Sequence, residues 1–176
     1  MIDERGFKDV LSNWTSGVGI VTSCLNQIPY GMTVSSFTSV SVSPLLISIC
    51  VQNRYRMCSI IGKTHCFAVN ILGCNQAVLA KKFSDSQLSP EERFEGLHWQ
   101  NFAARSPIIP ESIAWLDCKL FDYWIIGDHT IFVGQAINGF VTGESQPLLY
   151  YQRNWYKPVL LAHANREQEN LQGAAP

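Results

Sequence analysis

The stretch Gly17-Val-Gly-Ile-Val-Thr-Ser-Cys-Leu25, continued by Asn26-Gln-Ile-Pro-Tyr-Gly31 and Met32-Thr-Val-Ser-Ser-Phe-Thr-Ser-Val-Ser41, decides the fold class. Its first and last parts are rich in β-branched residues, and the six residues between them have the composition of a turn. The stretch therefore predicts two strands, residues 17–25 and 32–41, joined as a hairpin.

The rest of the chain continues this pattern. Residues 45–51 follow Ser43-Pro44 and are apolar on both sides, which predicts a strand buried on both faces. Further strands are expected at residues 66–72, 113–124, 130–140 and 148–151. Many antiparallel strands with few helices indicate a mainly β fold, built as a closed or split barrel.

Three short helices are expected among these strands. The first spans residues 3–14 with Asp3 as its cap, the second spans 57–61 and ends at Gly62, and the third spans 76–83. The apolar residues of the first helix recur at intervals of three and four, which predicts one packed face: Phe7, Val10, Leu11 and Trp14. We expect residues 84–112 to form a polar, irregular excursion, residues 1–160 to form one domain, and residues 161–176 to form a mobile C-terminal tail.

Composition excludes several function classes. The net charge is −1 and the Lys and Arg residues are scattered, so neither a nucleic-acid footprint nor a membrane surface is indicated. An acidic start and the lack of a long apolar run predict a soluble, cytoplasmic protein. Charged residues make up only 15% of the chain, against about a quarter on average, so some apolar surface is expected to be covered in a homodimer.

Motifs for metals, dinucleotides and hydrolysis are missing from the sequence. No two cysteines have the two-residue spacing that is typical of a zinc site. We therefore expect no metal site, and we expect all six cysteines to carry reduced thiols: Cys24, Cys50, Cys58, Cys66, Cys74 and Cys118. Gly17-Val-Gly19 lacks the third glycine of a Rossmann loop, and no nucleophile-elbow pentapeptide is present.

Three groups of residues remain as candidates for chemistry, and each has two interpretations. The hydroxyls from Thr33 to Ser41 could pair across strands, or could hold a ligand rich in carbonyls, ring nitrogens and phosphate oxygens, such as a flavin. Lys81-Lys82 beside Phe83 could close a helix or bind a phosphate. In Gly127-Asp128-His129, the histidine could be structural, or Asp128 could orient it for function.

The order of several motifs resembles the short-chain flavin reductase family, the reductase components of two-component flavin-dependent monooxygenases. The likeness covers residues 7–157 and rests on the following runs: Trp14-x-x-Gly17-Val-x-Ile-Val-Thr22, Gly31-Met-Thr-Val-Ser-Ser-Phe-Thr-Ser-Val-Ser41, Phe67-Ala-Val-Asn-Ile-Leu72, Arg93-Phe-x-Gly96, Gly127-Asp-His129 and Pro147-Leu-Leu-Tyr-Tyr151. The resemblance implies a split antiparallel Greek-key β-barrel homodimer of the FMN-binding type, which binds FMN or FAD, is reduced by NADH or NADPH, and releases reduced flavin by diffusion to a separate monooxygenase.

The resemblance also assigns roles to residues. The segment Thr33, Val34, Ser35, Ser36 and Phe37 would line the isoalloxazine ring and ribityl chain, with further contacts from Gln52 and Asn53. The phosphate end would lie at Ala80, Lys81, Lys82 and Phe83. His129, with Asp128 beside it, would lie near the flavin and the nicotinamide, and Tyr151 and Arg153 would close the site near the dimer interface.

Two departures and two rival functions accompany this hypothesis. Pro44-Leu45 replaces a frequent Pro-Pro of the family, and Arg54-Tyr55-Arg56 stands where members often carry a small hydroxyl residue, so Tyr55 either stacks on the flavin or narrows its site. The residues leave open a non-enzymatic flavin or haem carrier on the same barrel. They also leave open a pyridoxamine-phosphate-oxidase-like enzyme or a flavin-dependent electron-transfer protein.

Overall fold

The computed structural model describes residues 1–142 and 145–160 of the 176-residue chain. The strands are β1 (Ser16–Gly17), β2 (Gly19–Leu25), β3 (Ile28–Val34), β4 (Thr38–Val42), β5 (Leu45–Gln52), β6 (Cys66–Ile71), β7 (Gln100–Asn101), β8 (Pro107–Ile108), β9 (Ala114–Ile126), β10 (His129–Val141), β11 (Leu149–Tyr151) and β12 (Asn154–Tyr156). The helices are α1 (Glu4–Ser12), α2 (Arg56–Thr64), α3 (Ala77–Ser84) and α4 (Pro90–Phe94), with a short 3-10 helix, η1 (Cys74–Gln76).

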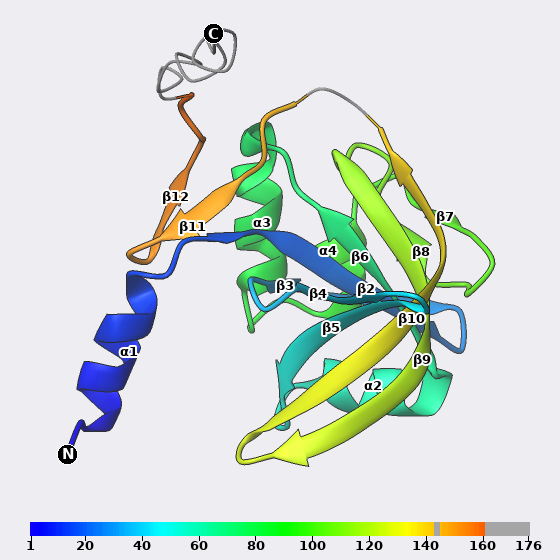
Figure 1. Ribbon diagram of the computed structural model, residues 1–176. Coiled ribbons are helices and arrows are strands. Elements are labelled where there is room, and N and C mark those ends of the chain that lie inside the picture. Colours follow the sequence, from blue (N-terminus) through cyan, green and yellow to red (C-terminus); the bar gives the residue numbers. More distant parts are fainter. Residues whose placement is uncertain (143–144, 161–176) are drawn as a thin grey trace, which may run out of the picture.

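One antiparallel sheet of seven strands forms the body of the molecule, in the order β3-β2-β6-β9-β10-β5-β4. Helix α2 packs on strands from both halves of this sheet, β2, β3, β5 and β6, so the sheet curls around the helix (Figure 1). Met57, Ile60 and Ile61 of α2 are buried in the same core as Phe67 and Phe132 of the sheet. The predicted mainly β, split-barrel fold is therefore confirmed.

The predicted hairpin is present but shorter than expected. Strands β2 and β3 are joined at Asn26 and Gln27, both in the left-handed region with φ of 52° and 66°, so the turn does not extend to Gly31. The second predicted strand, residues 32–41, is not continuous, because β3 and β4 lie at opposite edges of the sheet. Residues 35–37 cross between these edges, which alternation along one strand could not have revealed.

Two further elements differ from the prediction. Strand β5 alternates between buried and partly exposed residues, so it is not buried on both faces. Helix α2 continues past Gly62 to Thr64, and His65 ends it in the left-handed conformation with φ of 51°. The helical backbone at Gly62 shows that a glycine near a helix end is not always its cap.

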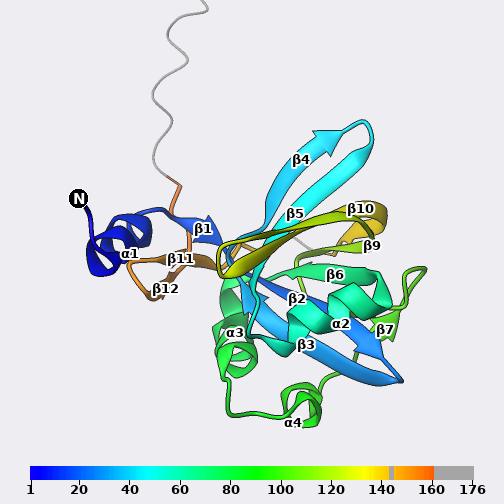
Figure 2. The same cartoon turned by 90° about the horizontal axis from the view of Figure 1, so that it is seen from below.

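Helix α1 is capped as predicted but its apolar face is not buried by its own chain. The side chain of Asp3 accepts a hydrogen bond from the backbone N–H of Gly6 at 2.8 Å. All four residues of the predicted packed face are exposed: Phe7, Val10, Leu11 and Trp14. Together with β11 and β12, α1 forms an arm that extends away from the barrel (Figures 1 and 2).

All six cysteines carry free thiols. Cys118 on β9 is buried, which raises the pKa of its thiol to about 12, whereas Cys50 and Cys66 on β5 and β6 are only half-buried. Among the described residues, no group of three or more His, Cys, Asp or Glu side chains is arranged to hold a metal ion. In the same part of the chain, no helix has the length and apolarity to span a membrane.

Buried polar side chains fasten the irregular excursion to the sheet. The Asn70 Oδ1 atom accepts a hydrogen bond from the backbone N–H of Ile109 at 2.8 Å, and Asp117 Oδ2 accepts one from Ala104 at 2.8 Å. Thr22 donates its hydroxyl to the carbonyl oxygen of Pro107. This segment, whose only strands in the described chain are the two-residue β7 and β8, thereby satisfies further backbone groups inside the protein.

Asp117 makes the stability of the fold depend on pH. The residue is fully buried, and burial raises the pKa of its carboxyl, although the Ala104 N–H partly opposes the shift. In the unfolded chain the Asp117 carboxyl has a pKa of about 3.9. As pH rises past this value, the carboxyl loses its proton in the unfolded chain while it still keeps the proton in the folded protein. Stability therefore falls as pH rises through that value, and each unit by which the pKa is raised costs about 1.4 kcal/mol at neutral pH.

We expect Asp117→Asn to remove this part of the pH dependence. Chemical denaturation of both proteins between pH 3 and pH 8 should show the wild type losing stability relative to the variant as pH rises. Asp122→Asn, which removes an exposed carboxylate from the same strand, is the control and should follow the wild type. If the free energy of unfolding varied with pH in the same way for the wild type and Asp117→Asn, the Asp117 carboxyl would have the same pKa in the folded and unfolded states, and the prediction would be wrong.

Candidate functional site

The crossing segment, residues 35–37, brings the predicted flavin residues beside strand β5. Ser36 Oγ donates a hydrogen bond to the carbonyl oxygen of Cys50 and accepts one from its N–H, both at 3.0 Å. Gln52 follows two residues later on β5, which is about 7 Å along a strand. The backbone groups of residues 35–37 take part in no strand ladder within the described chain, so they remain available to a ligand.

The predicted histidine lies at the end of the same strand pair. Gly127, with φ of 59°, allows a tight turn between β9 and β10. His129 begins β10 and lies directly opposite Gln52 of the neighbouring strand β5. Asp128 accepts a hydrogen bond from Gln52 Nε2 at 3.1 Å and lies 2.6 Å from His129 Nδ1. These bonds from Gln52 and His129 lower the pKa of the Asp128 carboxyl. The carboxylate therefore holds a proton on Nδ1 and leaves Nε2 for a ligand.

Asn53 completes this corner of the sheet. Its backbone N–H donates to the carbonyl oxygen of Asp128 at 2.9 Å, and its side-chain Oδ1 accepts the hydroxyl of Thr130 at 2.7 Å. Cys58 of α2 donates to the same Thr130 hydroxyl oxygen at 3.4 Å. The structure thus brings together Gln52, Asn53, Asp128 and His129. The backbone N–H and the side-chain Oδ1 of Asn53 are both used in hydrogen bonds within the protein that hold this corner of the sheet.

The predicted phosphate end lies against strand β3. The hydroxyl of Thr33 donates to the carbonyl oxygen of Ala80 at 2.6 Å, which joins β3 to α3. Phe83 of α3 is buried and makes an edge contact with Phe94, with ring centroids 5.0 Å apart. Thr33, at the start of the predicted ring segment, is therefore adjacent to Ala80 of the predicted phosphate end.

The two lysines contribute less to this end than expected. Lys82 donates its ammonium group to the carbonyl oxygen of Glu95 at 2.9 Å, and Lys81 is exposed on α3. Neither lysine lines the cavity that opens beside Phe83. For Lys82, the structure thus favours the interpretation of a side chain that fastens a helix end.

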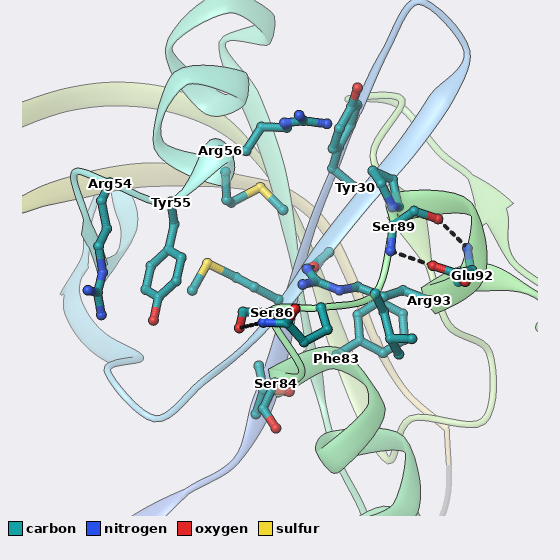
Figure 3. Close-up of a pocket in the computed structure, with 17 residues that line it drawn as sticks. Tyr30, Arg54, Tyr55, Arg56, Phe83, Ser84, Ser86, Ser89, Glu92 and Arg93 are labelled. Atoms are coloured by element: carbon teal, nitrogen blue, oxygen red, sulfur yellow. Dashed lines mark hydrogen bonds between the residues drawn. The ribbon is translucent and has the colours of Figure 1, made fainter.

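Arginines line this cavity instead (Figure 3). It has a volume of about 610 Å³ and lies between β3, the start of α2, the end of α3 and α4. Arg54, Arg56 and Arg93 are its cationic residues. Arg93 donates to the carbonyl oxygens of Gly31 at 2.9 Å and Asp85 at 2.6 Å, and burial lowers the pKa of its guanidinium. Sequence reasoning did not predict this group of arginines because its members come from two separate segments, unlike the adjacent lysines.

Tyr151 and Arg153 do not reach the site within one chain. Both lie on the hairpin of β11 and β12, in the arm that carries α1 (Figure 1). Arg153 pairs with Asp9 of α1 at 2.7 Å, and Gln152 donates its backbone N–H to the carbonyl oxygen of Ser12 at 2.8 Å. These contacts hold α1 to the hairpin, and the hairpin packs on the barrel through Tyr150 and Trp155.

The described residues fit a planar ligand that ends in a phosphate. The unpaired backbone of residues 35–37 and the amide of Gln52 offer hydrogen bonds to a polar ring. The Thr33–Ala80 contact and the arginine-lined cavity lie at the other end. His129, with Nδ1 committed to Asp128, stands at the ring end of this arrangement.

Comparisons with known proteins agree with this geometry. Residues 11–158 match the family described as flavin reductase like domain. A flavin reductase of Pseudomonas putida is 34% identical over 152 residues, covering 86% of this chain and 88% of the relative. The reductase component of the FADH(2)-dependent resorcinol hydroxylase of a Rhizobium strain is 32% identical over 148 residues, covering 83% and 82%. The NADH:FAD oxidoreductase SgcE6 of Streptomyces globisporus, solved with NAD and FAD fragments, superposes with a TM-score of 0.83 at 29% identity, covering 94% and 99% of the two chains.

Proposed function

Since the chain belongs to the flavin reductase-like family, we propose that it is a cytoplasmic NADH- or NADPH-dependent flavin reductase that supplies reduced flavin to a separate monooxygenase. The observation that carries the proposal is the joining of His129, Asp128 and Gln52 beside the crossing segment. When bound, the flavin accepts a hydride from the nicotinamide and carries the two electrons away.

The protein's task is to hold two flat rings in one place. Hydride transfer needs the reacting atoms about 3 to 3.5 Å apart, and it needs little acid–base chemistry. Residues 35–37 and Gln52 would hold the flavin ring, Thr33 and Phe83 would flank its phosphate end, and His129 would position the nicotinamide or stabilise charge on the reduced ring. All of these contacts are non-covalent, which suits a flavin that must leave after reduction.

A spectrophotometric assay tests this proposal. Purified protein mixed with NADH or NADPH and catalytic FMN or FAD should remove the nicotinamide absorbance at 340 nm, at a rate proportional to enzyme. With catalase and a flavin-dependent oxygenase added, hydroxylated product should form although the two proteins elute separately on a sizing column. Flavin or haem binding without nicotinamide oxidation would instead identify a non-enzymatic carrier.

We also propose that the active form is a homodimer. The end of the β9–β10 hairpin exposes a dense apolar surface, and the arm exposes another: Tyr123, Trp124, Ile125 and Ile126, and Phe7, Val10, Leu11 and Trp14. Such surfaces on a chain with few charged residues indicate a partner. A second copy would cover them and bring the partner's arm, with Tyr151 and Arg153, towards the site.

Ile125→Glu should convert this dimer to a monomer. Ile125 is 70% exposed on β9, and a buried unpaired carboxylate at an interface costs several kcal/mol, roughly a thousandfold or more in dimer affinity. Val78→Glu on α3 is the control, since Val78 is 83% exposed and belongs to neither apolar surface. Sedimentation equilibrium should give the monomer mass for the first variant and the dimer mass for the second. A monomeric wild type would refute the proposal.

A further inference from the structure

The cavity of about 610 Å³ begins where the predicted flavin-binding residues end. It shares Thr33 and Phe83 with that set, both at the phosphate end. Within the segment assigned to the ring and ribityl chain, Thr33 lines the cavity, whereas the following residues of the predicted ring site do not: Val34, Ser35, Ser36, Phe37, Gln52, Asn53, Asp128 and His129. A group that fills this cavity would therefore be attached beyond the phosphate and not be part of the ring.

The cavity carries a positive charge. Arg54, Arg56 and Arg93 line it, and Glu92 is its acidic residue. Glu92 turns its carboxylate to the backbone N–H of Ser89, 2.7 Å away, which lowers the pKa of the carboxyl and commits it to starting α4. Asp85, which lies near Arg93, accepts the N–H of Gln87 at 2.8 Å. No carboxylate pairs with Arg54 or Arg56 in the described chain, so both guanidinium groups remain available to an anion.

An aromatic surface accompanies these charges. The guanidinium carbon of Arg54 lies 5.3 Å from the centre of the Tyr55 ring, so the two side chains are stacked side by side (Figure 3). Tyr55 is 39% exposed, which leaves ring surface for another flat group. Stacking of a nucleobase on an aromatic side chain contributes about 1–3 kcal/mol in other proteins. Cations and an aromatic ring in one cavity suit an adenine nucleotide.

We infer that this chain selects FAD over FMN, with Arg54 and Arg56 as separate cationic contacts for the adenosine diphosphate group and Tyr55 stacking on the adenine. The inference rests on the proposed function, because it assumes that the ring lies at residues 35–37. FMN ends at its single phosphate, whereas FAD continues into an adenosine diphosphate group. NADH carries the same group, but its nicotinamide must reach His129, and the cavity adjoins the phosphate end of the flavin site instead. Arg54-Tyr55-Arg56, which stands where family members often carry a small hydroxyl residue, would thereby determine which flavin the protein prefers.

Flavin binding to the double variant Arg54→Ala/Arg56→Ala tests the inference. Equilibrium titration without nicotinamide, followed by flavin fluorescence, gives dissociation constants for FAD and FMN separately. The wild type should bind FAD more tightly than FMN. The variant should lose about 20-fold in affinity for FAD, since two partly solvated charge-assisted contacts are removed, and less than about twofold for FMN. Tyr55→Ala should also weaken FAD binding selectively, and Tyr55→Phe should restore it.

A charge-matched control separates local contacts from the overall field of the protein. Lys63→Ala/Lys119→Ala removes two exposed cations that do not line the cavity, and it should bind both flavins as the wild type does. Equal losses of FMN and FAD in the arginine variant would overturn the inference, as would equal affinities in the wild type. A higher KM for NADH or NADPH with unchanged FAD binding would also overturn it, since the cavity would then belong to the nicotinamide. A wild type that binds FAD but oxidises no nicotinamide would refute the proposed function alone.

Discussion

Replacing His129 by alanine should lower kcat/KM for the nicotinamide by about 30-fold, or ~2 kcal/mol of transition-state stabilisation. The dissociation constant for the flavin should stay within about twofold of the wild-type value, because the Thr33 end of the site is untouched. The structure supplies the reason, since His129 lies opposite Gln52 with its ring 45% exposed. A half-exposed ring beside the crossing segment can contact a substrate without filling the core.

The hydrogen bond to Asp128 decides which nitrogen of His129 does this work. Because Nδ1 lies 2.6 Å from the carboxylate, it keeps its proton, and Nε2 is the atom that can contact the nicotinamide or the reduced ring. Gln52 donates to the other oxygen of Asp128 and so fixes the carboxylate from a neighbouring strand. We therefore interpret Asp128 as a positioning residue that acts through the imidazole.

Steady-state kinetics with both nicotinamides, combined with flavin titrations, provide the measurement. His98→Ala is the matched control, because His98 is exposed on the excursion and makes no comparable contact, and its kinetics should equal those of the wild type. If His129→Ala retains the wild-type turnover and nicotinamide KM, the histidine is structural. If it loses flavin affinity instead, it belongs to the flavin-binding residues.

Much of the fold could be predicted from local patterns because its elements are locally consistent. Asp3 caps α1 as its position before the helix indicates, and residues 66–72 contain β6 as their β-branched run indicates. The failure at residues 35–37 has a tertiary cause, because Ser36 bonds to Cys50 across the fold. A continuous run of Ser, Thr and Val residues gives no sign of that partner.

The candidate site divides in the same way. His129 and Asp128 are adjacent in sequence, and their turn chemistry predicts the pair. Arg56 and Arg93 share a cavity only because α2 and α4 both pack on β3, which no spacing in the sequence reveals. The lysine pair shows the opposite case, because the two residues are adjacent in sequence but only Lys82 makes a contact that fastens α3 to the loop after α4, and a phosphate-binding role for the pair stays a prediction.

Gly31→Ala should destabilise the protein by about 2 kcal/mol, which corresponds to a fall in Tm of about 4–8 °C. A Cβ atom at Gly31 would lie 2.4 Å from Cε1 of Phe83, and 3.3 Å from Cε2 of Phe94. Phe83 is 1% exposed and packs against Phe94, so admitting the methyl group means breaking this edge contact or moving α3 away from β3. Either change would disturb the residues at the phosphate end of the site.

Thermal and urea denaturation of four variants measures this effect: Gly31→Ala, Gly62→Ala, Phe83→Leu and the double variant Gly31→Ala/Phe83→Leu. Gly62→Ala is the control, since Gly62 has a helical backbone in the last turn of α2 and nothing lies within 4 Å of its added Cβ, and it should stabilise the protein by about 0.5–1 kcal/mol. Phe83→Leu combined with Gly31→Ala should cost less than the sum of the two single changes, because the smaller side chain removes the clash. Additive costs would mean that the backbone of β3 absorbs the methyl group. If the contact between β3 and α3 sets the position of the residues at the phosphate end of the site, variants that are less stable in this series should also bind flavin more weakly.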